Sequence, residues 1–385
     1  MSVIYLDNNA TTRVAPEVKE AILPFLEDLY GNPSSPHHFG GQIEKHLTLA
    51  RQSVAALLGC SPKEVFFTSG GTESDNLAIR GVLAARPDKR HIVTTAVEHS
   101  AVLVQCRELV RQGYRVDFLP VDCQGRLDPS DVERAIHEDT GIVSIMWANN
   151  ETGVIFPIPE IASICKARKV PLHVDAVQAV GKTPIDLRAV PIDLLSLSGH
   201  KIHAPKGVGV LFVRTGMRMK PILWGGHQER GKRPGTEPVP LIAGLGKAAE
   251  LALARLETEQ TEVARLRDKL QRGLVETVPN LILNGAEAPR LPNTLNVCFR
   301  GVEGEALLLL MDQHGIAASS GSACLADKLE PSHVLLAMGV SEADAMGAVR
   351  FSLSRYTTEA EIDRALGVLP ALNEKVLRLA DRVAV

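Results

Sequence analysis

The sequence predicts an α/β fold in which a large, doubly wound, mostly parallel sheet of seven strands is joined to a smaller α+β domain. From Glu64 onward, short apolar runs alternate with helical patterns, an order typical of a parallel sheet covered by helices on both faces. The predicted strands are residues 65–68, 92–95, 114–121, 142–147, 171–174, 194–197 and 208–213. A second observation is one long helical pattern from Pro240 to Val278, which would link the sheet to a second lobe.

The segments outside this sheet carry clear boundary signals. Pro16 opens a helix with a predicted kink at Pro24, and a second amphipathic helix is expected from Gln42 to Leu58, where Gly59 ends it. Shorter strands are expected after the long helix, and a capping box at residues 358–361 opens the last helix. We expect residues 15–255 to form the large domain and residues 1–14 with 256–385 to form the small one.

The composition indicates which kinds of binding partner to expect. The 385 residues are 45% hydrophobic, and 42 basic residues stand against 45 acidic ones, which gives a net charge of −3. No block of like charge indicates nucleic acid or an anionic membrane, so small ligands are the expected partners. The longest aliphatic run, residues 306–311, is too short to span a bilayer, and the first residues lack a basic segment followed by an apolar one. The sequence therefore predicts a cytoplasmic protein.

Six cysteines lie without C-x-x-C spacing, which argues against a zinc knuckle or a disulfide framework. Five of them have apolar neighbours and are expected in the core: Cys60, Cys106, Cys123, Cys165 and Cys298. Cys324 differs, because its neighbours are small residues and glycine, which predict an exposed loop. A thiol in such a loop is a candidate for reactivity.

Lys201 follows the apolar strand 194–197 after the break Ser198-Gly199, so it is predicted at the carboxyl end of a sheet strand, where ligands bind in open α/β sheets. A desolvated lysine there can form a Schiff base with an aldehyde cofactor, although an ordinary surface lysine is the alternative. Asp175 ends another predicted strand, with Gln178 three residues later. A carboxylate there can keep a pyridine nitrogen protonated, or it can simply cap the next helix. The two together favour a functional site.

Further polar residues follow other predicted strands. The glycines of residues 68–76 and Thr72 can cradle a phosphate at a helix start, or form only that helix start. His99 could stack on a planar ring or carry protons, and a core histidine is equally compatible. Asn150 could bond a cofactor oxygen or a substrate carboxylate. Arg350 enters an apolar strand and requires a carboxylate partner, from the protein or from a substrate.

These segments together resemble the cysteine desulfurases. The resemblance covers nearly the whole chain, and it is carried by Asp7-Asn-Asn-Ala-Thr-Thr, Thr68-Ser-Gly-Gly-Thr-Glu-Ser-Asp-Asn, Glu98-His, Asn149-Asn-Glu-Thr-Gly, His173-Val-Asp-Ala-Val-Gln, Ser198-Gly-His-Lys and Ser320-Gly-Ser-Ala-Cys. Two further segments, His203-Ala-Pro-Lys-Gly and Gly225-Gly-His-Gln-Glu-Arg-Gly, resemble the NifS branch, which is associated with nitrogenase cluster assembly, more than the housekeeping IscS branch.

The resemblance implies a fold-type I pyridoxal 5'-phosphate enzyme and a homodimer with sites at the subunit interface. Lys201 would hold the cofactor covalently and move protons, Asp175 would pair with the ring nitrogen, and His99 would stack on the ring and assist proton transfer. Gln178 and Asn150 would bond the ring's phenolic oxygen, with Asn150 also near the substrate carboxylate. The remaining implied contacts are with the phosphate, from Gly71, Thr72, Ser198 and His200 and from Thr236 of the other subunit.

The resemblance also implies the reaction. Arg350 would clamp the carboxylate of L-cysteine, and Cys324 would take the sulfur as a persulfide, leaving L-alanine. An iron-sulfur scaffold protein of the NifU or IscU kind would then accept the sulfur. No metal site is expected, and an iron-sulfur cluster at Cys324 is the one metal contact left open. The alternatives left open are a housekeeping IscS-type desulfurase, a selenocysteine lyase, an aminotransferase, and a catalytically silent sulfur carrier.

Overall fold

The computed structural model describes residues 3–320 and 330–383 of the chain. Its main element is a seven-stranded sheet in the order β2-β8-β7-β6-β5-β3-β4. All seven predicted strands are present: β2 (Val65–Thr68), β3 (His91–Thr95), β4 (Arg115–Leu119), β5 (Thr140–Met146), β6 (Leu172–Asp175), β7 (Leu194–Ser198) and β8 (Gly209–Val213). β8 runs antiparallel to both of its neighbours, while the pairs from β7 through β4 are parallel, which confirms a mostly parallel sheet.

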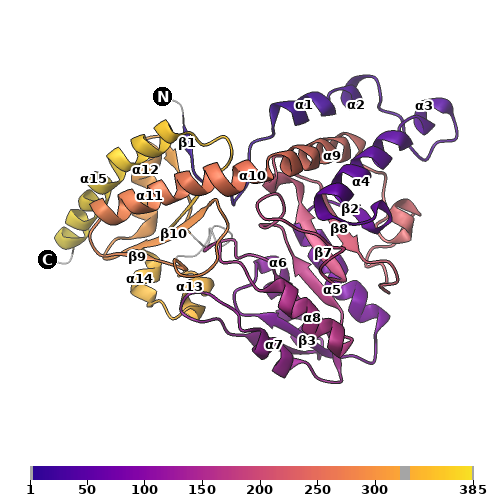
Figure 1. The fold of residues 1–385 in the computed structure, drawn as a ribbon, viewed down its shortest axis with the longest axis horizontal. Helices are drawn as coiled ribbons and strands as arrows, with labels where there is room; N and C mark the ends of the chain where they lie inside the picture. Colours follow the sequence, from indigo (N-terminus) through magenta and orange to yellow (C-terminus); the bar gives the residue numbers. More distant parts are fainter. Residues whose placement is uncertain (1–2, 321–329, 384–385) are drawn as a thin grey trace.

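Both faces of this sheet are covered, so its strands are apolar on both sides. Alternate strand residues pack in two separate cores, as Phe67 and Phe66 of β2 do. One face packs against α5 (Gly71–Ala85) and α6 (Ser100–Arg111). The other packs against α4 (Glu44–Leu58), α7 (Pro129–Ala135), α8 (Ile158–Arg168) and α9 (Val239–Ala254). The sheet is therefore doubly wound, as predicted (Figure 1).

A second, smaller sheet is antiparallel and has the order β12-β10-β9. Its strands are β9 (Leu281–Leu283), β10 (Thr294–Phe299) and β12 (Ala348–Ser352), and it packs with α11 (Ala264–Thr277), α12 (Gly304–Gln313) and α15 (Glu359–Val383). The same core contains Ile4 and Leu6, because β1 (Ile4–Tyr5) pairs with β11 (Ile316–Ala317). The division into a large and a small domain at residues 15 and 255 stays a prediction.

The predicted long helix is interrupted. α9 ends before Arg255, whose φ of −104° and ψ of 5° are not helical, and α10 (Leu256–Thr258), a π-helical turn (Glu259–Val263) and α11 continue the path. Figure 1 shows these helices in line, running from the large sheet to the small one. The other helices are α1 (Pro16–Ile22), α2 (Pro24–Glu27), α3 (His38–Gly41), α13 (His333–Ala337) and α14 (Glu342–Met346). The break at Pro24 and the left-handed cap at Gly59 were both predicted.

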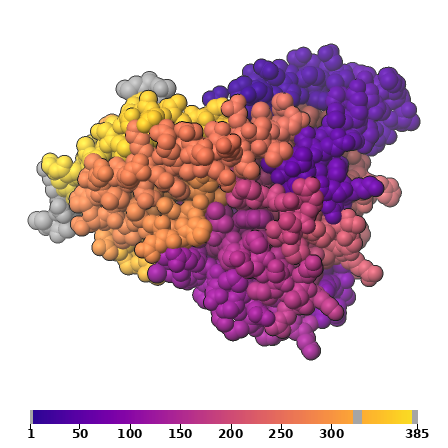
Figure 2. Space-filling view, in the orientation of Figure 1, coloured from indigo at the N-terminus to yellow at the C-terminus, as the bar shows by residue number. Residues whose placement is uncertain are grey.

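One cysteine prediction was wrong. Cys123 is exposed, whereas Cys106, Cys165 and Cys298 are buried and Cys60 is partly buried. The reason is local, because the Asp122 carboxylate accepts hydrogen bonds from the backbone of Gln124 and Arg126 and so forms a surface turn around Cys123. Within residues 3–320 and 330–383, we find no helix long and apolar enough to cross a membrane. The molecule is shown in space-filling form in Figure 2.

Candidate active site

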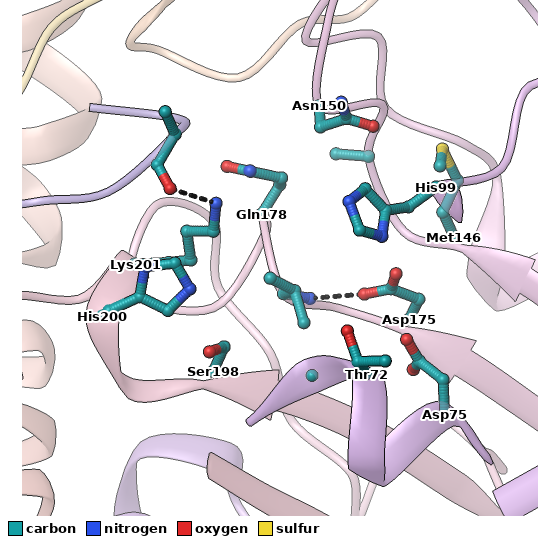
Figure 3. Close-up of a pocket in the computed structure, with 14 residues that line it drawn as sticks. Thr72, Asp75, His99, Met146, Asn150, Asp175, Gln178, Ser198, His200 and Lys201 are labelled. Atoms are coloured by element: carbon teal, nitrogen blue, oxygen red, sulfur yellow. Dashed lines mark hydrogen bonds between the residues drawn. The ribbon is translucent and has the colours of Figure 1, made fainter. Parts of the chain in front are cut away.

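The carboxyl ends of β2, β3, β5, β6 and β7 meet at one edge of the large sheet, and they surround a cavity of about 240 Å³. Every cofactor-binding residue predicted from the sequence lines this cavity except Thr236. The lining residues that were predicted are Gly71, Thr72, His99, Asn150, Asp175, Gln178, Ser198, His200 and Lys201. Figure 3 shows Lys201 and Asp175 on opposite sides, with Ser198 and Thr72 near one end and Asn150 at the other.

Lys201 reaches the cavity from a short 3₁₀ turn, Gly199–Lys201, that directly follows β7. Its Nζ atom donates hydrogen bonds to the backbone oxygens of Asn9 and Ala10, the second at 2.9 Å. These oxygens belong to the Asp7–Thr12 turn, which the sequence predicted without a role. The turn therefore holds the lysine amino group at the cavity wall.

Asp175, the last residue of β6, is a buried carboxyl group facing the cavity. Burial raises its pKa above the usual range, while His99, a hydrogen bond from the Val177 backbone N–H and Lys201 act in the opposite direction. The Val177 contact measures 2.9 Å. A cationic ring nitrogen placed against this carboxylate would gain a strong, charge-assisted partner in a site of low dielectric constant.

His99 is the N-cap residue of α6, and its Nδ1 accepts a hydrogen bond from the Ala101 backbone N–H at 3.2 Å. In the neutral ring the proton therefore resides on Nε2. Burial lowers the pKa of His99, with Asp175 opposing this effect. His99 is thus a predominantly neutral imidazole at the cavity wall, able to donate from Nε2.

The end of the cavity near Thr72 and Ser198 suits a phosphate. Gly71 is the first residue of α5, and a Cβ atom there would lie 2.8 Å from Cγ2 of Val177, so a larger residue would push the helix start away. Backbone N–H groups at the start of α5 and the hydroxyls of Thr72 and Ser198 are donors for an anion. His200 Nδ1 lies 3.1 Å from Thr11 Oγ1, and burial lowers the pKa of His200 to about 4. It would meet a phosphate as a neutral donor.

Two predicted site residues, Thr236 and Arg350, do not line the cavity. Thr236 is exposed and does not line this cavity. Arg350 is buried in β12, where Nη2 pairs with Asp7 Oδ1 at 2.8 Å and Nη1 donates to the Asn150 backbone oxygen at 3.1 Å. Of the two partners that the sequence left open for Arg350, a protein carboxylate is therefore present. Cys324 lies outside the described residues.

Sequence reasoning gave no role to several residues at the site. Asp75 of α5 is buried, lines the cavity, and has its Oδ1 atom 3.5 Å from His173 Nε2. Burial raises the pKa of Asp75 well above the usual range, and Asp175 adds to this shift. Lys182 contacts Gln178 from behind the cavity. No sequence signal marked Asp75, because its partner His173 comes from a distant segment.

The donor set fits pyridoxal 5'-phosphate. Lys201 would hold its aldehyde carbon, Asp175 its ring nitrogen, and the start of α5 with Thr72, Ser198 and His200 its phosphate. Within residues 3–320 and 330–383, no group of three or more His, Cys, Asp or Glu side chains could hold a metal ion. An α/β sheet with this donor set at its carboxyl edge defines the class of fold-type I pyridoxal phosphate enzymes.

Comparison with known proteins specifies the family. The family model described as aminotransferase class-V matches residues 4–365. A cysteine desulfurase of Trichormus azollae is 56% identical over 380 residues, covering 99% of this chain and 95% of the relative. The cysteine desulfurase NifS of Azotobacter vinelandii is 54% identical over 373 residues, covering 97% and 93%. A solved structure of a NifS-like protein superimposes with a TM-score of 0.91 at 40% identity, covering 97% of this chain and 100% of that one. The chain therefore belongs to the aminotransferase class-V family and, within it, to the cysteine desulfurases.

Proposed function

We propose that this protein is a pyridoxal phosphate-dependent cysteine desulfurase of the NifS type. It removes sulfur from L-cysteine, releases L-alanine and carries the sulfur as a persulfide on Cys324. The observation that carries this proposal is the meeting of Lys201, Asp175 and His99 in one cavity whose other end offers phosphate donors. The extensive identity to cysteine desulfurases supports the choice of substrate.

Each residue has a definite task in this reaction. Lys201 holds the cofactor and moves a proton at the substrate α-carbon, and the Asp7–Thr12 turn fixes where its amino group lies. Asp175 would keep the ring nitrogen protonated, and His99, whose Nδ1 accepts from Ala101, would stack on the ring and exchange protons through Nε2. When bound, pyridoxal phosphate withdraws electrons from the substrate carbon atoms. Burial of these groups excludes water and strengthens their electrostatic contacts.

Arg350 would bind the carboxylate of L-cysteine. Its Nη1 already reaches the backbone of Asn150, a residue that lines the cavity, so the guanidinium lies close to the site. Its Nη2 pairs with Asp7 Oδ1 at 2.8 Å. A substrate carboxylate would therefore have to share or replace this ion pair.

Sulfur transfer is a displacement at sulfur. The Cys324 thiolate forms a sulfur–sulfur bond to the substrate sulfur as the bond between that sulfur and Cβ breaks. The carbon fragment keeps the electron pair and takes up a proton to become L-alanine, so Cβ is reduced and the transferred sulfur is oxidised. Ser319, close to Cys324 in the sequence, exchanges two backbone hydrogen bonds with Arg350, at 2.7 and 3.3 Å, which supports an approach of Cys324 to the bound substrate.

The proposal extends to the assembly. We infer a cytoplasmic homodimer in which Thr236 of one subunit completes the phosphate site of the other, and a large domain of residues 15–255 joined to a small domain of residues 1–14 and 256–385. The persulfide would pass to an iron-sulfur scaffold protein, for nitrogenase maturation. The 54% identity to the Azotobacter vinelandii NifS supports that role.

The test uses single-turnover production of alanine and sulfide from L-cysteine with a reductant. We expect the wild type to release equal amounts of both. Cys324→Ala should retain the colour of the bound cofactor and lose more than about 100-fold of the activity, since its nucleophile is missing. The matched control is Cys123→Ala, which removes an exposed thiol distant in sequence and should leave the activity unchanged.

Two outcomes would contradict the proposal. Equal sulfide release from wild type and Cys324→Ala would make the protein a direct lyase, of the kind that acts on selenocysteine. Absence of alanine from a wild type that binds the cofactor would exclude L-cysteine as the substrate and favour an aminotransferase.

A further inference from the structure

Gln178 lines the cavity, and the orientation of its side-chain amide decides which atom it offers there. An amide oxygen can only accept a hydrogen bond, while the nitrogen can donate two. Under the proposed function, Gln178 must donate to the phenolic oxygen of the cofactor. The nitrogen, rather than the oxygen, therefore has to face the cavity side.

Two contacts of Gln178 fix this orientation, one made by its side-chain oxygen and one by its side-chain nitrogen. Lys182 Nζ lies 3.0 Å from Gln178 Oε1 and 3.1 Å from the Gln178 backbone oxygen. On the other side, Gln178 Nε2 donates to the Asn9 backbone oxygen at 3.0 Å. The reversed amide would set the Lys182 donor against a donor and the Asn9 acceptor against an acceptor. Both contacts would be lost together.

Lys182 does not touch the cavity itself. It is 6% exposed and lies with Glu259 and Arg355 in a small space behind Lys201, whereas Gln178 separates it from the ligand side. Burial lowers the pKa of Lys182 to about 7, helped by Lys201 and opposed by Glu259. A lysine in this position is costly to bury, and the two acceptor atoms of Gln178 offset part of that cost.

We propose that Lys182 is a positioning residue that fixes the amide of Gln178 with Nε2 toward the cofactor. The role rests on the proposed function, because it acts on pyridoxal phosphate only through Gln178. It also links the cavity to the Asp7–Thr12 turn, since Asn9 receives hydrogen bonds from both Gln178 and Lys201. Through Gln178, Lys182 is thus connected to the backbone oxygen that accepts from the catalytic lysine.

The experiment is a double-mutant cycle on the holoenzyme, with Lys182→Met, Gln178→Met and the double variant. It measures the visible absorption spectrum of the bound cofactor and the rate at which the cofactor is lost on dialysis. We expect each single variant to shift the absorption band and to lose cofactor about tenfold faster, since the proposed hydrogen bond from Gln178 Nε2 to the cofactor is lost or misplaced. The double variant should be no worse than Gln178→Met alone.

Glu259→Gln is the matched control, because it removes a buried charge beside Lys182 without touching Gln178. It should retain the wild-type spectrum. Lys182→Gln, which still offers an N–H donor, should lie closer to the wild type than Lys182→Met, and it keeps the test valid if the methionine variant fails to fold.

The outcomes distinguish failure of the positioning role of Lys182 from failure of the proposed function. Wild-type behaviour of both Lys182 variants beside an impaired Gln178→Met would overturn the positioning role and leave the proposed function intact. Additive effects in the double variant would show that Lys182 acts independently of Gln178. A wild-type spectrum for Gln178→Met would instead remove the assignment of Gln178, and the role of Lys182 with it.

Discussion

Single residues at the strand ends carry both the chemistry and part of the stability of this protein. Glu98, just after β3, is fully buried, and its Oε1 accepts hydrogen bonds from Thr95 Oγ1 at 2.8 Å and from the Met146 backbone N–H at 3.0 Å. It thereby ties the end of β3 to the end of β5. Burial raises the pKa of Glu98 to about 8.

This shift predicts how stability depends on pH. The folded state holds a proton on Glu98 that the unfolded chain releases above its ordinary pKa of 4.5, so Glu98 lowers the free energy of unfolding as the pH rises toward about 8. Glu98→Gln cannot ionise, so its free energy of unfolding should not fall for this reason as the pH rises. We expect the variant to exceed the wild type by at least about 1 kcal/mol near pH 8.5, with the difference shrinking near pH 5.

Urea unfolding at both pH values measures this difference. Glu276→Gln, at an exposed position of α11, is the control for losing one carboxylate and should change little. A Glu98→Gln variant that is less stable than the wild type at the higher pH would contradict the account.

Some single residues of the site could be predicted from the sequence and others could not. Lys201, Asp175 and His99 were found because each lies at or shortly after the end of an apolar strand, and the carboxyl ends of the strands meet at one edge. Lys182 gave no such signal, since a lysine four residues after a glutamine resembles a solvated helix charge. Its partner Gln178 is held in turn by Asn9, which is distant in sequence but adjacent in the fold.

At the scale of elements, the strands of the large sheet were predictable because they are buried on both faces and form continuous apolar runs. The direction of each strand could not be predicted, since an apolar run looks the same in both directions. β8 runs antiparallel to both of its neighbours. β1 and β11 have two residues each, too few to show a pattern. The break at Arg255 was missed because the surrounding sequence favours a helix.

At the scale of the whole molecule, the sheet edge explains the proposed site, but Thr236 lies outside the cavity of its own subunit. If the partner subunit supplies it, a hybrid dimer of one Lys201→Ala and one Thr236→Ala subunit should contain one complete site. The complete site would join Lys201 of one chain with Thr236 of the other. We therefore expect the hybrid to retain cofactor about tenfold longer at that site than the Thr236→Ala homodimer.

Co-expression with two affinity tags and measurement of cofactor loss tests this arrangement. The Thr236→Ala homodimer is the reference for two incomplete sites. If the hybrid loses its cofactor as fast as that homodimer, Thr236 acts within its own subunit and the shared site is wrong.

The central claim is that this molecule moves sulfur from L-cysteine to Cys324, and direct detection of the sulfur tests it most sharply. The holoenzyme is mixed with an equimolar amount of L-cysteine without reductant, alanine is quantified, and the digested protein is analysed by mass spectrometry. We predict one added sulfur atom on the peptide that contains Cys324 for each alanine formed, and none on the exposed Cys123. Alanine accompanied by free sulfide, with Cys324 unmodified throughout, would contradict the account.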